Sequence, residues 1–360
     1  MPANSLILEN FRCFSSLSVN FSPTLNLFHG ANAAGKTSLL EALYFLGHGR
    51  SFRSAKTDTL IRGSAESFMI RSELGSDVGT THQIGLGKKR RQGLIARMDG
   101  KKPSVLSDIA SVFPIMLIDS EANRLIQDGP GRRRRYLDWG VFHVEHKFLP
   151  AWRRYQRALK QRNELLRQSA GVAEIRAWDS ELIETAEQID TCRRACLEQL
   201  QEPAQTLLAI ALPGIEFSLH YRPGWAVGET YDEALEKGLA RDRSIGATQA
   251  GPHRADLDIT LNGVPARERV SRGQQKMLAG ALWLAQSRLF RVATGKAVCL
   301  LVDDLPAELD SRFSGIFQSL LLEEPAQLIM TATSAEVLQA PDFQGKALFH
   351  VEQGAVTREA

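Results

Sequence analysis

Residues 25–37 read Leu-Asn-Leu-Phe-His-Gly-Ala-Asn-Ala-Ala-Gly-Lys-Thr, a short apolar run followed at once by the spacing G-x-x-x-x-G-K-[ST]. Between a strand and a helix, this spacing predicts a loop whose backbone N–H groups surround phosphate oxygens, with the helix N-terminus adding partial positive charge. We expect the Lys36 ammonium to contact the β- and γ-phosphates of ATP and the Thr37 hydroxyl to ligate Mg²⁺. The predicted nucleotide-binding residues of this loop are Gly30, Ala31, Asn32, Ala33, Ala34, Gly35, Lys36 and Thr37.

Two adjacent aspartates, Asp303 and Asp304, follow the apolar run 298–302. A continuous apolar run is typical of a strand that is buried on both faces of a sheet. A phosphate loop needs a carboxylate at the end of a neighbouring buried strand, so we expect Asp303 to ligate Mg²⁺ and Asp304 to orient or polarise the attacking water. Adjacent aspartates in a loop are more often solvated, but the strand and the phosphate loop together favour a catalytic role for Lys36, Asp303 and Asp304.

A third motif, Ser271-Arg272-Gly273-Gln274-Gln275-Lys276, immediately precedes the apolar helix predicted for residues 277–289. It resembles the LSGGQ signature of ABC ATPases, in which a hydroxyl and a glycine at a helix N-terminus form an anion site. In those ATPases the signature reaches the γ-phosphate held by a second subunit, so the resemblance implies an ATP-dependent, head-to-tail homodimer. An ordinary helix N-cap is the alternative. The implied contacts with the partner's nucleotide are Ser271, Gly273, Gln274 and, in a segment that resembles the D-loop (residues 307–310), Asp310.

Further segments extend the resemblance to the RecF family over nearly the whole chain. Residues 133–139 look like the family's Arg-rich Leu-Asp-Trp stretch, residues 161–163 like its lobe-two helix, and residues 251–256 like its GPHR segment; residues 10–12 also match. The paired aspartates suit this family better than ABC transporters, whose second acid is usually glutamate. The resemblance implies an α/β fold, that of an ABC-type P-loop ATPase head, with an inserted and mostly helical lobe two.

The same resemblance implies a cytoplasmic protein of DNA replication, recombinational repair and the SOS response, with no membrane partner. Members of the family bind single-stranded DNA and duplex/gap junctions, work with RecR and RecO, and assist RecA loading at gaps. Thr331-Ala332-Thr333 stands where ABC transporters carry a switch histidine, so no imidazole is available to hold the γ-phosphate. Asp304 is one methylene shorter than the glutamate of transporters, which predicts slow hydrolysis. We therefore expect a slow, DNA-stimulated ATPase that acts as a switch.

Basic side chains gather between residues 130 and 168, where eleven lysines and arginines stand against three carboxylates. The formal charge of this segment is +8, against −5 for the rest of the chain. Such an asymmetry indicates an anionic partner for one lobe, and a solvated helical face is the alternative. For the consecutive arginines we expect contact with DNA or a partner, with pairing to Asp138 or capping of the preceding loop as the structural alternative: Arg132, Arg133, Arg134 and Arg135.

Strand and helix patterns occur at both ends of the chain, with a helical segment between them. We expect residues 1–120 and 245–360 to form the discontinuous ATPase head, and residues 121–244 to form the helical, basic lobe two. Within that lobe, an apolar residue recurs every seven positions, which predicts helix-on-helix packing rather than a long coiled coil. The stripe consists of Ile175, Leu182, Ile189 and Cys196.

Smaller features complete the expectations. The helix that follows the phosphate loop is predicted to run from Lys36 to Leu46 and to stop at Gly47. The four cysteines are expected to be reduced thiols, because none belongs to a Cys/His cluster with zinc spacing. No apolar stretch approaches the length of about 18 residues that a transmembrane helix needs.

Three other classes of protein share some of these motifs. The ATPase subunit of an ABC transporter would need a switch histidine and a coupling surface for its membrane domains. An SMC-type ATPase would need several hundred residues of coiled coil between Lys36 and Ser271, which are separated by only 235 positions here. A module that binds ATP as a structural ligand without hydrolysing it stays open, and the effect of Asp304→Asn on turnover separates it from a switch.

Overall fold

The protein is represented by a computed structural model that describes residues 2–75, 79, 81–103, 105–304, 309–337 and 345–359. Its contacts divide the chain into two compact units: unit 1 holds residues 1–122 and 290–360, and unit 2 holds residues 123–289. The two ends of the chain thus join in one unit, as the strand and helix patterns indicate. Residues 245–289, which were expected in the head, group with unit 2 by contact, and the functional boundary between head and lobe stays a prediction.

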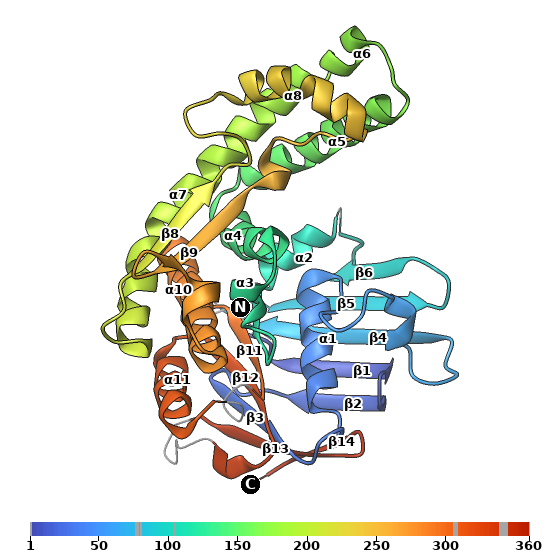
Figure 1. The fold of residues 1–360 in the computed structure, drawn as a ribbon. Helices are drawn as coiled ribbons and strands as arrows, with labels where there is room; N and C mark the ends of the chain where they lie inside the picture. Colours follow the sequence, from blue (N-terminus) through green and yellow to red (C-terminus); the bar gives the residue numbers. More distant parts are fainter. Residues whose placement is uncertain are drawn as a thin grey trace. The chain divides into compact units, whose positions relative to one another are not determined.

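The first layer of unit 1 is a six-stranded sheet with the order β14-β13-β3-β12-β11-β7 (Figure 1). Its inner strands are parallel, and only β14 runs antiparallel, against β13. Strand β12 is buried along its whole length, as expected of a parallel strand covered on both faces. The strands are β3 (Leu25–His29), β7 (Ile115–Ile118), β11 (Cys299–Asp303), β12 (Gln327–Ala332), β13 (Ala347–Glu352) and β14 (Ala355–Arg358).

The second layer of unit 1 is an antiparallel sheet with the order β2-β1-β4-β5-β6. Buried and partly exposed residues alternate along β4, so one face of this sheet packs inward and the other lies toward solvent. The strands are β1 (Ser5–Phe11), β2 (Phe14–Asn20), β4 (Ser67–Gly75), β5 (Thr81–Lys89) and β6 (Leu94–Met98).

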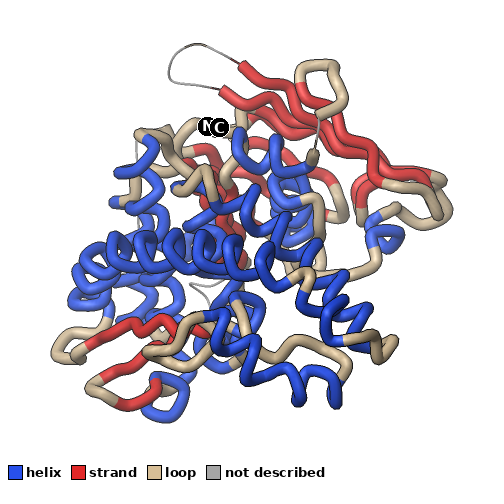
Figure 2. Tube along the Cα trace, turned by 90° about the horizontal axis from the view of Figure 1, so that it is seen from above, coloured by secondary structure: helices blue, strands red, loops and turns tan. Residues whose placement is uncertain are grey.

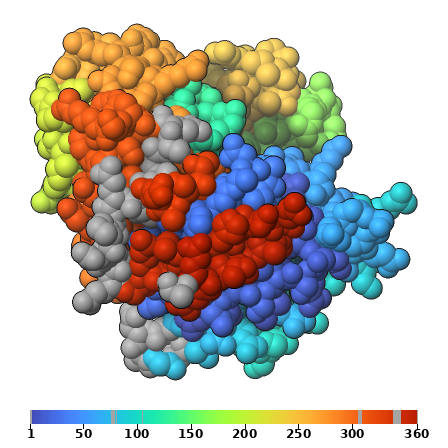
Figure 3. All heavy atoms as spheres, turned by 90° about the horizontal axis from the view of Figure 1, so that it is seen from below, coloured from blue at the N-terminus to red at the C-terminus, as the bar shows by residue number. Residues whose placement is uncertain are grey.

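The core of unit 1 lies around helix α1 (Lys36–His48), whose apolar side chains share one cluster with both sheets. Strand β13 pairs with β3, so the two ends of the chain meet in one sheet. Figure 3 shows the C-terminal segment, in red, beside the N-terminal segment, in blue. Short helices complete the unit: η1 (Thr57–Leu60), α2 (Leu106–Val112), α11 (Ser311–Glu323) and η4 (Ala335–Val337).

The predicted end of the helix after the phosphate loop is wrong by two residues. Gly47 lies inside α1, where a Cβ atom would come 3.2 Å from the Cβ of Ile115, so its missing side chain lets the helix approach β7. The helix ends instead at Gly49, whose φ of 65° is the left-handed conformation that favours glycine. Two glycines near a helix end serve different purposes, and the sequence pattern alone does not separate them.

Unit 2 is mostly helical, with a small antiparallel sheet of order β10-β9-β8 (Figure 2). Helices α5 and α7 pack against each other, which confirms the predicted helix-on-helix packing, and the four residues that recur every seven positions are fully buried. The elements are α3 (Arg124–Gln127), α4 (Pro130–Val144), α5 (Phe148–Arg167), α6 (Val172–Arg176), α7 (Asp179–Ala211), β8 (Phe217–Arg222), α8 (Tyr231–Ile245), η2 (Pro252–Arg254), β9 (Asp256–Leu261), β10 (Val264–Pro265), α9 (Ala266–Arg269) and α10 (Arg272–Thr294), the last of which continues into unit 1. Among the described helices, none combines the length and the apolar character that a membrane crossing requires.

Candidate nucleotide-binding site

The predicted phosphate loop lies between β3 and α1, so it has the strand-loop-helix context that its spacing requires. Gly30 has a φ of 152°, and a Cβ atom there would overlap the carbonyl oxygen of Val351. Gly35 has a φ of 121°, and a Cβ atom there would come 2.8 Å from the Sγ atom of Cys13. Both positions therefore demand glycine, because the backbone is left-handed and the neighbouring atoms leave no room. Ala33 is also left-handed, with a φ of 65°.

Lys36 is held against this loop by the loop's own backbone. Its Nζ atom donates hydrogen bonds to the carbonyl oxygen of Gly30 at 2.8 Å and to that of Ala31 at 3.1 Å, and the side chain is almost fully buried. Both acceptors are neutral, so these bonds position the ammonium without neutralising its charge. A buried cation at the start of a helix is the electrostatic arrangement that a phosphate group favours.

The carboxylate of Asp303 meets the first turn of α1, although its strand is not the direct neighbour of β3. The prediction placed these strands side by side, but β12 lies between them in the sheet. The predicted contact between the two motifs is nevertheless present, since the hydroxyl of Thr37 donates to Oδ1 of Asp303 at 3.0 Å. The hydroxyl of Thr331, from the strand between, donates to the same carboxylate oxygen at 2.7 Å.

Thr331 is the site residue whose role the sequence analysis missed. Its Oγ1 atom also accepts a hydrogen bond from the backbone N–H of Asp304 at 3.0 Å, so one buried hydroxyl holds both aspartates. The sequence had singled out this position only as one where a switch histidine is absent. A hydroxyl residue on the strand next to an Asp-Asp pair is the signal that could have identified it.

Burial and the neighbouring charge of Asp304 raise the pKa of Asp303, while the hydrogen bonds from Thr331 and Thr37 act in the opposite direction. The Oδ1 atom of Asp304 is buried and accepts no hydrogen bond in the described part of the chain, and its residue has a φ of 48°. A hydroxyl, a carboxylate and a second, unsatisfied carboxylate oxygen form an all-oxygen donor set. That set fits Mg²⁺, which prefers hard oxygen ligands.

The predicted signature residues lie at the start of α10. The backbone N–H of Ser271 donates to Oε1 of Gln274 at 3.0 Å, and the N–H of Gln274 donates to Oγ of Ser271 at 3.3 Å. This is a reciprocal helix cap, and Ser271 is exposed. Asp310 similarly caps α11 by accepting from the N–H of Phe313 at 2.9 Å, whereas residues 307 and 308 of the predicted D-loop lie outside the described residues. Both caps agree with the ordinary interpretation, and contact of Ser271, Gly273, Gln274 and Asp310 with a nucleotide stays a prediction.

The four consecutive arginines at the start of α4 have different surroundings. Arg133 is buried and forms a bidentate pair with Asp256, at 2.7 and 3.0 Å, and Arg134 donates to the carbonyl oxygen of Ala255. Arg132 pairs with Asp128 one turn away, and the exposed Arg135 donates to the carbonyl oxygen of Gly131. The alternative of pairing with Asp138 is not observed, because that carboxylate pairs with Arg193.

The GPHR segment is part of a buried polar network in unit 2. A carbonyl oxygen can only accept, so the contact of His253 Nε2 with the carbonyl of Thr248 places the proton on Nε2, and Nδ1 accepts from the hydroxyl of Tyr155 at 2.6 Å. Burial lowers the pKa of His253 to about 4. Arg193 donates to the carbonyl oxygen of Pro252 in the same segment. These residues therefore act in the packing of unit 2, as expected for a structural histidine.

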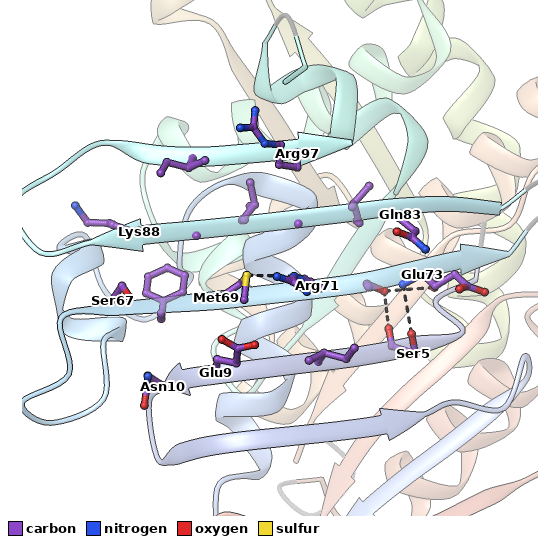
Figure 4. Close-up of a pocket in the computed structure, with 18 of the residues that line it drawn as sticks. Ser5, Glu9, Asn10, Ser67, Met69, Arg71, Glu73, Gln83, Lys88 and Arg97 are labelled. Carbon is purple, nitrogen blue, oxygen red and sulfur yellow. Dashed lines mark hydrogen bonds between the residues drawn. The ribbon is translucent and has the colours of Figure 1, made fainter. Parts of the chain in front are cut away.

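The outer face of the antiparallel sheet carries a separate hollow of about 710 Å³ (Figure 4). Gly85 and Gly87 of β5 leave its floor without side chains, and Ile7 and Ile95 border it. Within it, Nε of Arg71 donates to the sulfur of Met69 at 3.1 Å. None of the residues predicted to bind nucleotide lines this hollow, so it does not belong to the phosphate loop.

A phosphate loop between β3 and α1, with an aspartate pair anchored to it through the parallel sheet, defines this protein as an ABC-type ATPase. The fold agrees with the solved SMC head bound to the C-winged helix domain of ScpA, with a TM-score of 0.62 at 15% identity over 100% of this chain and 98% of that chain. The model of the family described as RecF/RecN/SMC N terminal domain matches residues 3–357. The chain belongs to the RecF family.

Curated relatives support this assignment over the full length. The chain is 38% identical to the DNA replication and repair protein RecF of Vibrio parahaemolyticus serotype O3:K6, over 99% of both chains, and 37% identical to that of Shewanella baltica, again over 99% of both. A solved structure described as the recombination mediator protein RecF-ATP in the RecFOR pathway has a TM-score of 0.89 and 28% identity, over 100% of this chain and 98% of that chain. Family membership gives the protein an ATPase role in DNA replication and repair.

Proposed function

We propose that this protein is an ATP-controlled switch that binds DNA during replication and recombinational repair in the cytoplasm. ATP joins two copies head to tail, with the triphosphate between the Lys36 loop of one copy and the Ser271 turn of the other. The closed dimer holds single-stranded DNA or a duplex/gap junction, and slow, DNA-stimulated hydrolysis releases it. With RecR and RecO, the dimer assists RecA loading at gaps and so supports SOS induction. The DNA structures and partners rest on the family likeness.

The observation that carries the ATPase part is the convergence on Asp303 of two hydroxyls, from Thr37 at 3.0 Å and Thr331 at 2.7 Å. Lys36 binds and orients the β- and γ-phosphates, because its ammonium is already fixed against the loop. Thr37 and Asp303 are the residues that would hold Mg²⁺, which supplies charge neutralisation at the phosphates. Asp304 orients the attacking water, and its short side chain together with a threonine at the switch position favours slow turnover.

Lys36→Ala tests the nucleotide switch. We expect this variant to lose ATP binding and ATP-dependent dimerisation, measured by isothermal titration calorimetry and by sedimentation with ATP, ADP and no nucleotide. Lys102→Ala is the matched control, because Lys102 is an exposed lysine of the same unit outside the loop. Dimerisation of the Lys36 variant with ATP, to the same extent as the wild type, would refute the proposed arrangement.

Asp304→Asn separates a hydrolytic switch from a module for which ATP is only a structural ligand. The substitution keeps the size of the side chain and removes its charge, so ATP binding should persist while phosphate release falls. We expect a loss of turnover of at least about tenfold, since positioned acid or base groups contribute roughly 10²- to 10⁴-fold. Unchanged phosphate release, with and without gapped DNA, would favour the non-hydrolytic interpretation.

A further inference from the structure

Some basic residues of segment 130–168 are bound by carboxylates of other helices or strands, and others are exposed on one face of α5. Arg133 is bound to Asp256. On α5, Arg154 is bound to two glutamates of α7, and Arg162, whose side chain is fully buried, is bound to Asp179 and Asp242. These three arginines are neutralised within unit 2, so they do not account for the affinity of this segment for an anion.

The exposed cations of α5 lie on one face of the helix. Arg153, Arg157, Lys160 and Arg167 are all exposed and are separated by four, three and seven residues, a spacing that returns to the same side of a 3.6-residue helix. We call these four residues the α5 stripe. At 1.5 Å per residue the stripe extends over about 21 Å. The opposite face of α5 is buried and includes Ala151, Tyr155, Ala158 and Leu166.

The stripe borders a surface groove of about 540 Å³. Arg157, Lys160 and Arg167 line this groove together with polar and apolar neighbours on the same helix, Gln156, Leu159 and Asn163. The amides supply further hydrogen-bond donors for phosphate oxygens, and Leu159 is the one aliphatic residue of the lining. Such a groove suits a polyanion better than a protein partner, which would need an apolar centre.

One carboxylate stands within this face. Glu164 is the single acidic residue in the sequence of α5, and it accepts a hydrogen bond from Nη2 of Arg167 at 2.6 Å. This ion pair joins two exposed side chains, so solvent screens it and its net strength is small. A phosphate group can therefore replace the carboxylate on Arg167, and Glu164 acts as an internal competitor that moderates the affinity.

Helix α5 is fixed from its buried side by the residues that resemble the family's lobe-two motif. Arg162 donates to Asp179 at 2.9 Å and to Asp242 at 2.7 Å, which ties α5 to α7 and α8. The side-chain oxygen of Asn163 accepts from both the backbone N–H and the hydroxyl of Thr248. The stripe is thus presented on a preorganised helix, so little ordering entropy is lost when it binds a ligand.

We propose that the α5 stripe is a binding site for the phosphate backbone of DNA. This proposal rests on the DNA binding assigned above and specifies the surface that performs it. The stripe's length of about 21 Å corresponds to roughly six phosphate steps at 3.4 Å per step. Contacts through guanidinium, ammonium and amide groups with phosphates carry no sequence information, so the site binds DNA independently of sequence and weakens steeply with salt.

The test is the salt dependence of DNA binding by the full chain with ATP, measured by fluorescence anisotropy on a gapped duplex. Each phosphate contact contributes about 0.9 to the slope of log K against log salt concentration, so the double variant Arg157→Gln/Lys160→Gln should lower the slope by about 1.8. If the double variant and the wild type bind DNA with equal affinity at 1 M salt, this difference in slope corresponds to a roughly 60-fold lower affinity of the variant at 0.1 M salt. ATP binding should be unchanged, because neither residue belongs to the phosphate loop.

Two further variants control this experiment. Arg176→Gln/Arg194→Gln removes the same charge from α6 and α7 of the same unit, where each arginine already pairs with a carboxylate, so its slope should stay close to that of the wild type. Glu164→Gln removes the internal competitor and should raise the affinity and steepen the slope.

An unchanged slope in the α5 double variant, or an equal loss in the Arg176/Arg194 control, overturns the assignment of DNA binding to α5 while leaving the proposed function intact. A lower affinity of Glu164→Gln also contradicts the assignment. Failure of the wild-type chain to bind gapped DNA with ATP overturns both proposals. The ATP-dependent dimerisation measured with Lys36→Ala is independent of either result.

Discussion

Thr331 is predicted to control the aspartate pair, although it belongs to neither the phosphate loop nor the Asp-Asp motif. Its buried hydroxyl donates to Oδ1 of Asp303 at 2.7 Å and accepts from the N–H of Asp304 at 3.0 Å. Thr331→Val keeps the shape of the side chain and removes both hydrogen bonds. The variant therefore tests the polar bridge without creating a cavity in β12.

The magnitude follows from the two lost bonds. A hydrogen bond to a charged group contributes about 1.5–3 kcal/mol, and a partly buried N–H left without an acceptor costs about 1–3 kcal/mol. Because the two bonds share one hydroxyl, they are not additive, and we expect the opening free energy of β11 and β12 to fall by about 2–4 kcal/mol. The hydrogen bond from Thr331 also lowers the pKa of Asp303. Loss of this bond raises the pKa of Asp303 further. The decrease in opening free energy is therefore largest at a pH where Asp303 is charged, and it becomes smaller as the pH falls through the raised pKa.

Tryptophan fluorescence does not report on β11 and β12, because every tryptophan of the chain lies within residues 123–289. Hydrogen exchange measured by mass spectrometry on the peptides of β11 and β12 is therefore the suitable assay. A loss of 2–4 kcal/mol corresponds to roughly 30- to 900-fold faster exchange. Thr333→Val is the matched control, because Thr333 is exposed and lies two residues further on. Exchange rates and ATP turnover of Thr331→Val that equal those of Thr333→Val would refute the bridging role.

Two further predictions concern unit 2, whose tryptophans report its unfolding in urea. Arg133→Met leaves Asp256 buried with the N–H of Leu257 and the weaker ion pair to Arg222, so we expect a loss of about 3 kcal/mol in the free energy of unfolding. Arg135→Met on the exposed side should cost less than about 1 kcal/mol. Equal losses would contradict a structural role for Arg133. The pKa of His253 is lowered to about 4 from its ordinary value of 6.5, so the unfolded chain takes up this proton first and stability is lost as the pH falls through this range. Protonation of His253 should therefore lower the free energy of unfolding of the wild type by about 3 kcal/mol between pH 6.5 and 4. A His253→Gln variant with the same pH dependence as the wild type would contradict this role of His253.

The ATPase motifs could be predicted from the sequence because their chemistry is local. Gly30, Gly35, Lys36 and Thr37 lie within eight residues. A loop of that length between a strand and a helix has few conformations that satisfy its backbone. The buried strand before Asp303 was similarly evident, since a continuous apolar run reports burial on both faces. Neither inference needed knowledge of which strands pair.

The exact partners of polar side chains could not be predicted in the same way. Arg133, Arg154 and Arg162 all belong to one basic segment, yet each is bound by a carboxylate from a different part of the chain. A count of charges gives the same weight to a buried arginine and an exposed one. Only the positions of α4 and α5 in the packed unit separate the arginines bound by distant carboxylates from the exposed α5 stripe.

By itself, the sequence determined that this protein carries a phosphate loop, an aspartate pair after a buried strand and a basic helical segment, since each depends on residues close together in the chain. The tertiary structure decided that β12 lies between the two motif strands, that Thr331 holds both aspartates, and which arginines face solvent. These outcomes depend on strand order and on helix packing between segments up to about 300 residues apart. Asp303, for example, accepts hydrogen bonds from both Thr37 and Thr331. Spacing along the chain carries no information about such distant contacts.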